Sequence, residues 1–299
     1  MPYPNWLDGL TDALRLSAAM TDKCALAGLP NGGGKTVIAL PGPVGQVGAE
    51  LRRAALHDAG ATIAELGGAY ATGPDVGTGP DDMATIGERT EHVFCRPVGR
   101  GGSGDSSPAT AIGTVAALRA VCESLFGSPD LAGHSFAIIG LGRVGGHVAR
   151  LLASAGARLI VSDTDESKRS LIPGAAWTDP AGCLRAEVDV LVPAALGGLL
   201  TPATTAGLRC RAIAGPANNQ LDAPATATLL HERGIPWAPD PVVSAGGIIH
   251  ATAVELRHQP EAAALAEVQA IGATLAGLLR TASAEGVPPA EIAARAIPT

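Results

Sequence analysis

Residues 136–146 read Phe136-Ala137-Ile138-Ile139-Gly140-Leu141-Gly142-Arg143-Val144-Gly145-Gly146. An apolar run leads directly into the spacing G-x-G-x-x-G, a pattern that is weak evidence when it stands alone. Here a helical segment, 147–155, follows it, and a second apolar run, Leu159-Ile160-Val161, comes next. A strand, a glycine turn, a helix and another strand in that order predict the first half of a dinucleotide-binding fold.

Each part of this pattern has a physical reason. Gly140 permits the tight turn, Gly142 lets backbone amides approach a pyrophosphate, and Gly145 lets the helix pack closely on the strand. The helix N-terminus then stabilises the anion. Asp163 lies twenty-three residues beyond Gly140, at the end of the second strand. A carboxylate there would accept hydrogen bonds from the ribose hydroxyls and repel a 2′-phosphate, so the sequence predicts NAD rather than NADP.

Outward from this turn, apolar runs and helical spacings alternate along the chain, which indicates a parallel sheet built from βαβ units. We therefore predict an α/β protein with two domains and a C-terminal helical segment. Residues 1–108 would form a substrate domain, 109–257 a Rossmann-type doubly wound NAD-binding domain, and 258–299 helices that pack back toward the first domain. The expected helices are 8–21, 47–67, 144–155, 261–283 and one that begins at about residue 109; the expected strands are 36–40, 135–139, 158–162, 188–193, 211–214 and 235–238.

The composition of the 299 residues, 46% hydrophobic and 16% charged, describes a globular protein with a sizeable core. A formal net charge of −7 and the lack of a basic cluster argue against a nucleic-acid partner. Charge, Gly or Pro breaks the apolar runs before membrane-spanning length, and no leader pattern opens the chain, so we expect no membrane partner. The five widely spaced cysteines predict free thiols in the cytoplasm and no metal site.

Only three lysines occur among the 21 Lys and Arg residues, and two of them, Lys23 and Lys35, flank the run Gly32-Gly33-Gly34. A chain that uses arginine for ordinary positive charge retains lysine for a reason, because burial moves the pKa of an amine whereas a guanidinium stays charged. Lys35 is therefore a candidate acid–base group and Lys23 a candidate anchor for an anion. Two surface lysines placed by chance are the alternative.

The same glycine run is similar to the end of a phosphate-binding P-loop. The first glycine of G-x-x-x-x-G-K-[ST] would fall on Leu29, however, and a helix precedes the run where a strand is required. The P-loop interpretation therefore fails on geometry.

Several further motifs, in order, resemble those of the amino-acid dehydrogenase family that includes the leucine, valine, phenylalanine and glutamate dehydrogenases. The resemblance is closest to the leucine, valine and phenylalanine branch and runs from about residue 5 almost to the C-terminus. Its motifs are MTDK (20–23), GGGK (32–35), TGPDV (72–76), DVLVPAALGG (189–198), AGPANNQL (214–221), APD (238–240) and AGGII (245–249).

The resemblance implies NAD-dependent oxidative deamination of an apolar L-amino acid, of the phenylalanine, leucine or valine class, to a 2-oxo acid and ammonia by a homo-oligomer. It implies that Lys35 is the catalytic base, that Asp75 is its proton-exchange partner, and that Lys23 binds the substrate carboxylate. The other residues it implies are Gly73, Asn219, Ile248 and Ala251 for the substrate, and Ser107, Thr110, Gly140, Gly142, Arg143, Val144, Gly145, Asp163, Ala194 and Asn218 for the cofactor.

The chain departs from the family at its start and in the predicted cleft. A Gly-Gly-x-Arg run of the family would fall before Met1, so either the true start codon lies upstream or the substrate domain is truncated. Asp22 replaces a bulky residue beside the first lysine, Ser244 replaces an Asn, and Ala194 replaces a Cys. These changes leave a second hypothesis, a catalytically weak or inactive homologue that serves as an NAD-binding or assembly subunit.

Two further features have a structural interpretation that we favour over a functional one. His250 follows a Gly-Gly pair and could line the cleft, but a structural imidazole is the simpler account. The neighbouring carboxylates Asp81 and Asp82 could bind a metal, but the solvated start of a helix explains them better.

Overall fold

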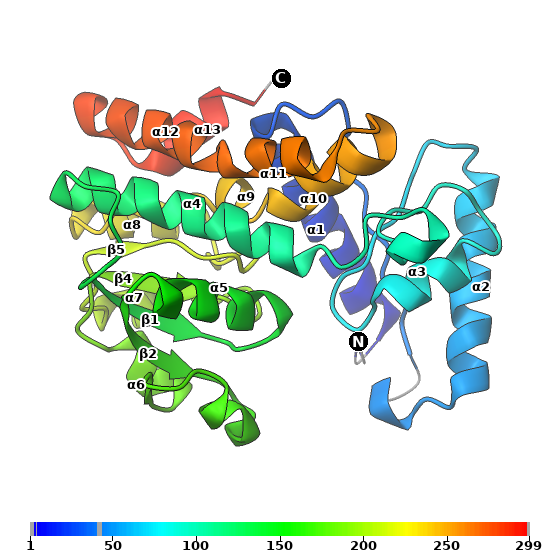
Figure 1. Ribbon diagram of the computed structural model, residues 1–299, viewed down its shortest axis with the longest axis horizontal. Coiled ribbons are helices and arrows are strands. Elements are labelled where there is room, and N and C mark those ends of the chain that lie inside the picture. Colours follow the sequence, from blue (N-terminus) through cyan, green and yellow to red (C-terminus); the bar gives the residue numbers. More distant parts are fainter. Residues whose placement is uncertain (1–2, 4, 41–43, 298–299) are drawn as a thin grey trace.

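A computed structural model of the protein describes residue 3, residues 5–40 and residues 44–297 (Figure 1). A parallel sheet occupies one side of the molecule, and helices α2 (Ala49–Glu65) and α3 (Pro80–Ile86) occupy the other. We refer to the described residues up to 106 as the first region and to residues 107–297 as the sheet region. Helix α1 (Trp6–Leu26) joins the two, because it belongs to the first region but packs on α9 (Asp240–Val243) of the sheet region.

The sheet has five parallel strands in the order β3-β2-β1-β4-β5. The order reverses at β1, which lies between β2 and β4, with Ile138 opposite both Val161 and Val192. In open α/β sheets, ligands bind beyond the carboxyl ends of the strands at such a switch point. The strands are β1 (Ser135–Ile139), β2 (Arg158–Ser162), β3 (Ala176–Trp177), β4 (Val190–Pro193) and β5 (Ala212–Ile213).

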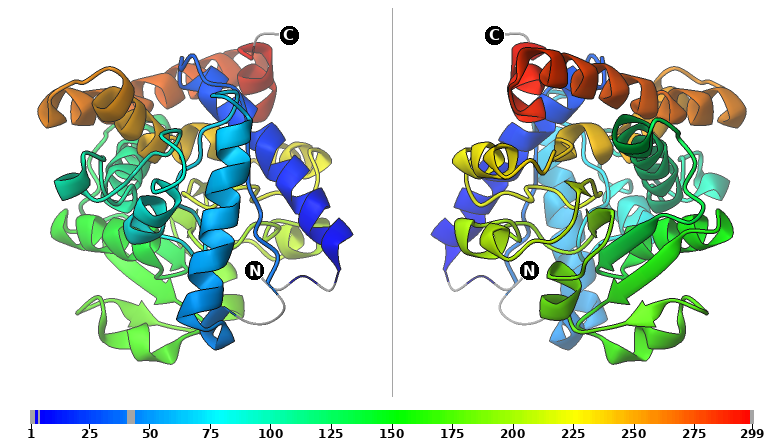
Figure 2. Two further views of the ribbon diagram at one scale, coloured as in Figure 1. Left: turned by 90° about the vertical axis from the view of Figure 1, so that its right-hand side faces the viewer. Right: turned by 90° about the vertical axis from the view of Figure 1, so that its left-hand side faces the viewer.

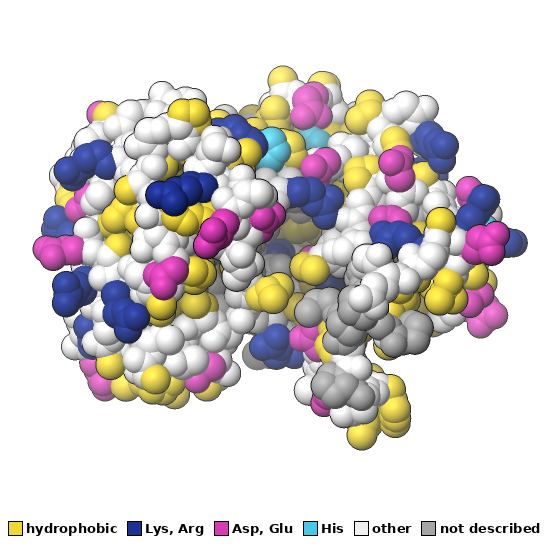
Figure 3. All heavy atoms as spheres, turned by 90° about the horizontal axis from the view of Figure 1, so that it is seen from below, with side chains coloured by type: hydrophobic (Ala, Val, Ile, Leu, Met, Phe, Trp, Pro, Cys, Tyr) yellow, Lys and Arg dark blue, Asp and Glu magenta, His cyan; other side chains and the backbone are white. Residues whose placement is uncertain are grey.

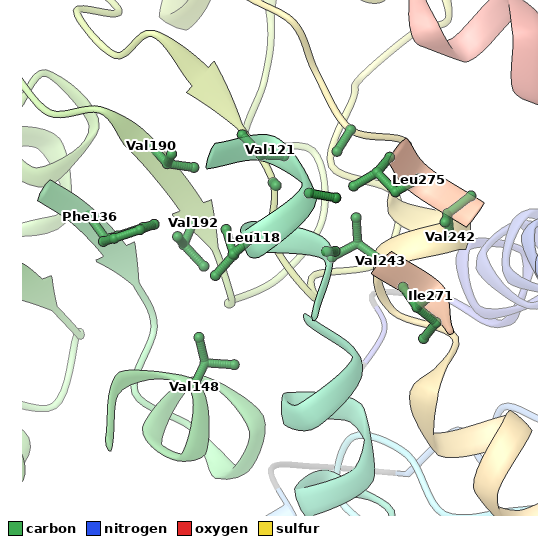
Figure 4. Close-up of a cluster of buried hydrophobic side chains, with 14 of the residues drawn as sticks. Leu118, Val121, Phe136, Val148, Val190, Val192, Val242, Val243, Ile271 and Leu275 are labelled. Atoms are coloured by element: carbon green, nitrogen blue, oxygen red, sulfur yellow. The ribbon is translucent and has the colours of Figure 1, made fainter. Parts of the chain in front are cut away.

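Helix α4 (Ser107–Phe126) covers one face of this sheet, and α12 (Ile271–Glu285) packs on α4 (Figures 1 and 2). Leu118 and Val121 of α4 lie between the strand residues Phe136 and Val192 and the α12 residue Leu275 (Figure 4). The small and branched apolar side chains of this chain thus fill a core formed by three layers: the sheet, α4 and α12. The remaining elements are α5 (Arg143–Ser154), α6 (Pro180–Leu184), α7 (Pro202–Ala206), α8 (Ala225–Glu232), α10 (Gly246–Ala251), α11 (Glu261–Gln269), α13 (Pro289–Arg295), the π-helical turn η4 (Thr252–Leu256) and the 3₁₀ turns η1 (Val44–Gln46), η2 (Val98–Arg100) and η3 (Glu166–Ser170).

Two helical stretches, Ser107–Phe126 and Glu261–Glu285, are long and apolar enough to cross a membrane, so the expectation that no apolar stretch reaches that length is wrong. Half of the apolar window of α4 is buried inside the molecule. Its side chains contact the sheet on one side and α12 on the other, which is the environment of a core helix in a globular protein.

Most of the expected elements are present, and the fold class is confirmed. The helices expected at 8–21, 47–67, 144–155 and 261–283 and the one beginning near 109 form, as do four of the strands, two with the expected ends and two that are shorter. Residues 36–40 are all described and form no strand. A strand needs a neighbouring segment with which to form backbone hydrogen bonds, and Thr72 of the first region pairs with Val93 instead. The strand expected at 235–238 is reduced to one bridge between Ile213 and Trp237.

Candidate active site

The glycine run positions Lys35 by close packing. A Cβ atom on Gly33 would overlap the carbonyl oxygen of Ser17 in α1, and one on Gly34 would overlap the ring of Tyr70. The Ser17 hydroxyl donates to the Gly33 carbonyl oxygen at 3.1 Å. The chain therefore passes between α1 and Tyr70 in a gap that only glycine fits. No helix follows within residues 35–40, which agrees with rejection of the P-loop.

Lys35 and Asp75 form an ion pair at this point. The Lys35 ammonium donates to Asp75 Oδ2, and the side chains are 19% and 37% exposed. Burial favours the neutral form of Asp75, but the Lys35 charge and the Val76 backbone N–H outweigh it and lower the pKa of the carboxyl. Asp75 is therefore an anion that stabilises the ammonium form of the amine beside it.

Lys23 lies in a different environment, because it is only 8% exposed. Its ammonium donates to Asn218 Oδ1 at 2.7 Å. Burial lowers the pKa of Lys23 to about 8; the carboxylate of Asp240 opposes this shift, and the like charge of Lys35 adds to it. The hydrogen-bond partner of Lys23 is thus a neutral amide, and its charge interacts with the charges of Lys35 and Asp75. Lys23 can therefore bind one more anion.

Asp240 is a functional candidate to which sequence reasoning assigned no role. This first residue of α9 is 5% exposed and accepts the backbone N–H of Asn219 at 2.8 Å. Burial raises the pKa of its carboxyl, while the Asn219 N–H and the Lys23 ammonium act in the opposite direction. The available signal was a single acid in the apolar stretch 235–243. Ser244 completes the group, since its hydroxyl lies 3.4 Å from Asn218 Oδ1.

The turn that carries Asn218 and Asn219 is held from within. Asn219 adopts a left-handed backbone conformation, with φ of 52°. The Gln220 side-chain amide donates to the Gly215 and Ala217 carbonyl oxygens at 2.7 and 3.0 Å. Among the described residues, the buried Nδ2 of Asn219 has no hydrogen-bond partner. A rigid turn with an unpaired donor at the cleft is suited to a ligand that supplies an acceptor.

The glycine turn at 140–145, which we call the dinucleotide turn, fits a dinucleotide. Gly140 has φ of 101°, and a Cβ there would come within 2.9 Å of Ala194. A Cβ on Gly145 would overlap the Gly140 carbonyl oxygen. A Cβ on Gly142, in contrast, would meet nothing within 4 Å. Two glycines are thus needed for packing and the third faces open space, as close approach to a pyrophosphate requires.

Asp163 follows β2, where the sequence places it. Its Oδ2 accepts the Leu141 backbone N–H at 2.7 Å and the Lys168 ammonium at 3.0 Å, and its Oδ1 accepts the Asp165 N–H at 2.9 Å. Burial acts to raise the pKa of Asp163, but these donors outweigh it and the pKa is lowered. Lys168, the third lysine, is a neighbour of Asp163 that sequence reasoning missed. It comes close because η3 turns the chain back toward the end of β2.

The other residues expected from the resemblance differ in their placement and exposure. Ser107 is buried and donates to Asp105 Oδ1 at 2.7 Å, and the Thr110 hydroxyl donates to the Ser106 carbonyl oxygen at 2.9 Å. Ala251 is 2% exposed, so it offers a ligand little surface. Gly73 lies on the exposed segment before Asp75, whereas Ile248 is partly buried on α10 and Val144 is partly buried on α5.

The surface is hollowed between the two parts of the molecule when it is viewed from below (Figure 3). A separate cavity of about 210 Å³ lies between α1, α9, α10 and the start of α12, but neither Lys23 nor Lys35 lines it. We place the candidate site at the polar residues, because proton transfer and anion binding need titratable groups and the cavity is mostly apolar.

The structural interpretations of two other features are confirmed. The His250 imidazole is buried and lies 2.9 Å from Glu261 Oε2, which ties α10 to α11. Asp82 accepts the Gly79 backbone N–H at 2.8 Å at the start of α3 and pairs with Arg52 at 2.8 Å.

Comparison with known proteins gives matches over most of the chain. The family model described as Glu/Leu/Phe/Val dehydrogenase, dimerisation domain, matches residues 7–92. The model described as Glutamate/Leucine/Phenylalanine/Valine dehydrogenase matches residues 101–167 and 161–259.

Individual relatives agree with these models. The phenylalanine dehydrogenase of Lysinibacillus sphaericus is 40% identical over 256 residues, which cover 83% of this chain and 66% of that protein. The valine dehydrogenase of Streptomyces albus is 37% identical over 300 residues, which cover 98% and 81%. The L-tryptophan dehydrogenase structure from Nostoc punctiforme has a TM-score of 0.75 and 34% identity, covering 99% of this chain and 84% of that one. The chain spans about two thirds of the length of the phenylalanine dehydrogenase.

The burial of Lys23 predicts a stability change at alkaline pH. Its pKa is about 8 in the folded protein and 10.5 ordinarily. Below pH 8 both states are protonated and the cost of burying the charge is fully present. Between these values the unfolded chain binds more protons, so the free energy of unfolding rises with pH.

Urea denaturation of the wild type and of Lys23→Met at pH 7 and pH 10 measures this difference. Comparison with the variant removes the contribution of the other titratable groups to the pH dependence. We expect the wild type to gain about 2 kcal/mol relative to the variant. A difference that does not change with pH would contradict the burial of a charged Lys23.

Proposed function

Because the chain belongs to the Glu/Leu/Phe/Val dehydrogenase family, we propose that it catalyses the NAD-dependent oxidative deamination of an apolar L-amino acid to a 2-oxo acid and ammonia. The observation that carries the proposal is the placement of two lysines in two environments. Lys23 is a buried cation whose hydrogen-bond partner is a neutral amide, and Lys35 is a half-buried amine paired with Asp75. This is the division between a carboxylate anchor and an acid–base group that the reaction needs.

In the proposed reaction, Lys23 and Asn219 orient the amino acid. The Lys23 ammonium holds the substrate carboxylate as a point charge, and the unpaired Nδ2 of Asn219 donates a second hydrogen bond. NAD, when bound at the dinucleotide turn, supplies the acceptor for the hydride that leaves Cα. A fixed carboxylate sets the orientation of Cα relative to that acceptor.

Lys35 and Asp75 would manage the protons. Hydride loss leaves an iminium carbon on the substrate, and Lys35, in its neutral form, takes a proton from the water that attacks this carbon. The resulting ammonium of Lys35 gives that proton to the amino group of the carbinolamine, and Asp75 accepts the hydroxyl proton as the carbonyl forms and ammonia departs. Arginine could not do this at neutral pH, because a guanidinium does not give up its proton.

The hypothesis of an inactive homologue receives little support from the site. Ser244, one of the departures from the family, donates to the Asp240 carbonyl oxygen at 2.6 Å and lies against Asn218. Asp22 is partly buried, and burial raises the pKa of its carboxyl. Ser244 thus keeps a polar contact with Asn218, the hydrogen-bond partner of Lys23.

The first prediction of the proposal concerns turnover. NADH formation should be measured at alkaline pH with leucine, phenylalanine and valine. We expect Lys35→Ala to lower kcat by about 10²- to 10⁴-fold with no change in thermal stability beyond that of a surface substitution, and we expect Lys35→Arg not to restore it.

Arg89→Ala, a change in the same region, serves as the control and should retain full activity. Absence of turnover by the wild type would overturn the enzymatic proposal. If NADH still bound, that result would support the hypothesis of an NAD-binding subunit.

The second prediction concerns the choice of cofactor. Asp163 supports NAD over NADP, but the Lys168 ammonium 3.0 Å from it offsets part of the negative charge that repels a 2′-phosphate. Lys168→Ala should therefore raise the ratio of kcat/KM for NAD to that for NADP, by about two- to fivefold for a partly exposed ion pair. Arg169→Ala is the control, and a lower ratio in Lys168→Ala would contradict the assignment.

The third prediction concerns assembly as a homo-oligomer. Four large apolar residues of α1 are exposed at helical spacing, namely Trp6, Leu7, Leu10 and Leu14, which are 69%, 54%, 46% and 63% exposed. A contiguous apolar stripe of this kind supports an interface, and we propose that a second copy of this chain covers it.

Sedimentation of the wild type, Leu14→Glu and Leu66→Glu tests this proposal. Leu14→Glu should dissociate the oligomer, since it places a charge in the apolar stripe. Leu66, an exposed residue that directly follows α2, serves as the control. An unchanged sedimentation coefficient for Leu14→Glu would overturn this interface.

A further inference from the structure

Arg143, which the resemblance implies for the cofactor, also reaches the first region. It is the first residue of α5, next to Gly142 of the dinucleotide turn. Its Nη2 donates to the carbonyl oxygen of Thr78 at 2.7 Å, across 65 residues of sequence. A Cβ on Gly79 would lie 3.5 Å from the Arg143 Nη1, so the guanidinium rests against the backbone of this loop. Arg143 thus links the sheet region to the loop that follows Asp75.

The loop at residues 75–79, which we call the Asp75 loop, is tightly bonded within itself. The Asp75 N–H donates to the Thr78 hydroxyl at 2.9 Å, and the Thr78 N–H donates to the Asp75 carbonyl oxygen at 2.9 Å. Arg52 holds the Gly77 carbonyl oxygen at 2.8 Å, and Asp82 holds the Gly79 N–H at 2.8 Å. A displacement of Thr78 therefore moves Asp75 with it.

Asp75 in turn holds the ammonium of Lys35. An unbroken set of contacts consequently runs from the dinucleotide turn through Arg143 and Thr78 to the acid–base pair. The contact begins at the helix N-terminus where an anion would bind, and Arg143 carries five N–H donors of which one is used on Thr78.

We propose that Arg143 is a positioning residue that latches the dinucleotide turn to the Asp75 loop and thereby couples cofactor binding to the placement of the Lys35–Asp75 pair. The inference rests on the proposed function and adds to it a specific link between the two sites. Coupling of this kind is reciprocal, so a 2-oxo acid must tighten NADH binding by the factor by which NADH tightens 2-oxo acid binding.

The binding test uses the fluorescence of NADH, titrated with and without a saturating 2-oxo acid derived from the best substrate. In the wild type, a coupling of about 5- to 150-fold is usual for two linked sites. Arg143→Ala should reduce this factor by about three- to tenfold, the effect of one lost hydrogen bond, whatever the variant does to the Kd for NADH alone. The matched control is Arg150→Ala, an exposed arginine farther along α5.

The outcomes separate the latch from simple cofactor binding. If Arg143→Ala weakens NADH binding equally with and without the 2-oxo acid, Arg143 is only a pyrophosphate ligand and the latch is overturned. An unchanged coupling factor would overturn it as well.

A second measurement is independent of cofactor and activity. Hydrogen exchange in peptides that contain the Asp75 loop should be about three- to tenfold faster in ligand-free Arg143→Ala than in Arg150→Ala, because the Thr78 carbonyl oxygen loses the donor that anchors the loop to the sheet region. Equal exchange would overturn the latch. Failure of the wild type to bind NADH would instead overturn the proposed function, and this exchange measurement would still decide on Arg143.

Discussion

The buried ammonium of Lys23 is the constraint on which the arrangement of the two regions depends. A buried charge costs several kcal/mol unless neighbouring groups compensate it. Lys23 belongs to α1, but its compensation comes from Asn218 and Asp240 of the sheet region. Helix α1 must therefore dock on α9 at one position and rotation. Because Ser17 of α1 also bonds the Gly33 carbonyl oxygen, the same docking fixes the start of the segment that carries Lys35.

The two lysines differ in what already neutralises them. Lys35 has a full counter-ion in Asp75, and the pair is partly open to solvent. Lys23 has a neutral amide at hydrogen-bond distance, and burial lowers its pKa to about 8. An added anion would stabilise an ammonium in that state. An amine with a carboxylate beside it can instead exchange a proton with that carboxylate. Burial and partner, rather than residue type, thus distinguish the two roles.

The parts of this structure that depend on neighbours in sequence could be predicted from the sequence. The dinucleotide turn is of this kind, because the positive φ of Gly140 and the close contact of Gly145 with the Gly140 carbonyl oxygen arise within a few residues. Residues 36–40 have strand composition but no available neighbour, and no local pattern shows that. Asp240 and the contact between Arg143 and Thr78 were missed for a related reason: each depends on where a distant segment lies. The rarity of lysine pointed to Lys23 and Lys35, but their different environments come from tertiary packing.

Polar contacts also join the two regions at points other than Lys23. The connecting segment, residues 95–106, has three points of left-handed backbone, namely Cys95 with φ of 62°, Gly101 with φ of 78° and Gly104 with φ of 77°. Glu255 in η4 holds it, since its Oε1 accepts the Cys95 and Ser103 N–H groups at 2.7 and 2.9 Å. Arg143 supplies a further link through its hydrogen bond to the Thr78 carbonyl oxygen, so the placement of the Asp75 loop depends on contacts with the sheet region as well as on the docking of α1.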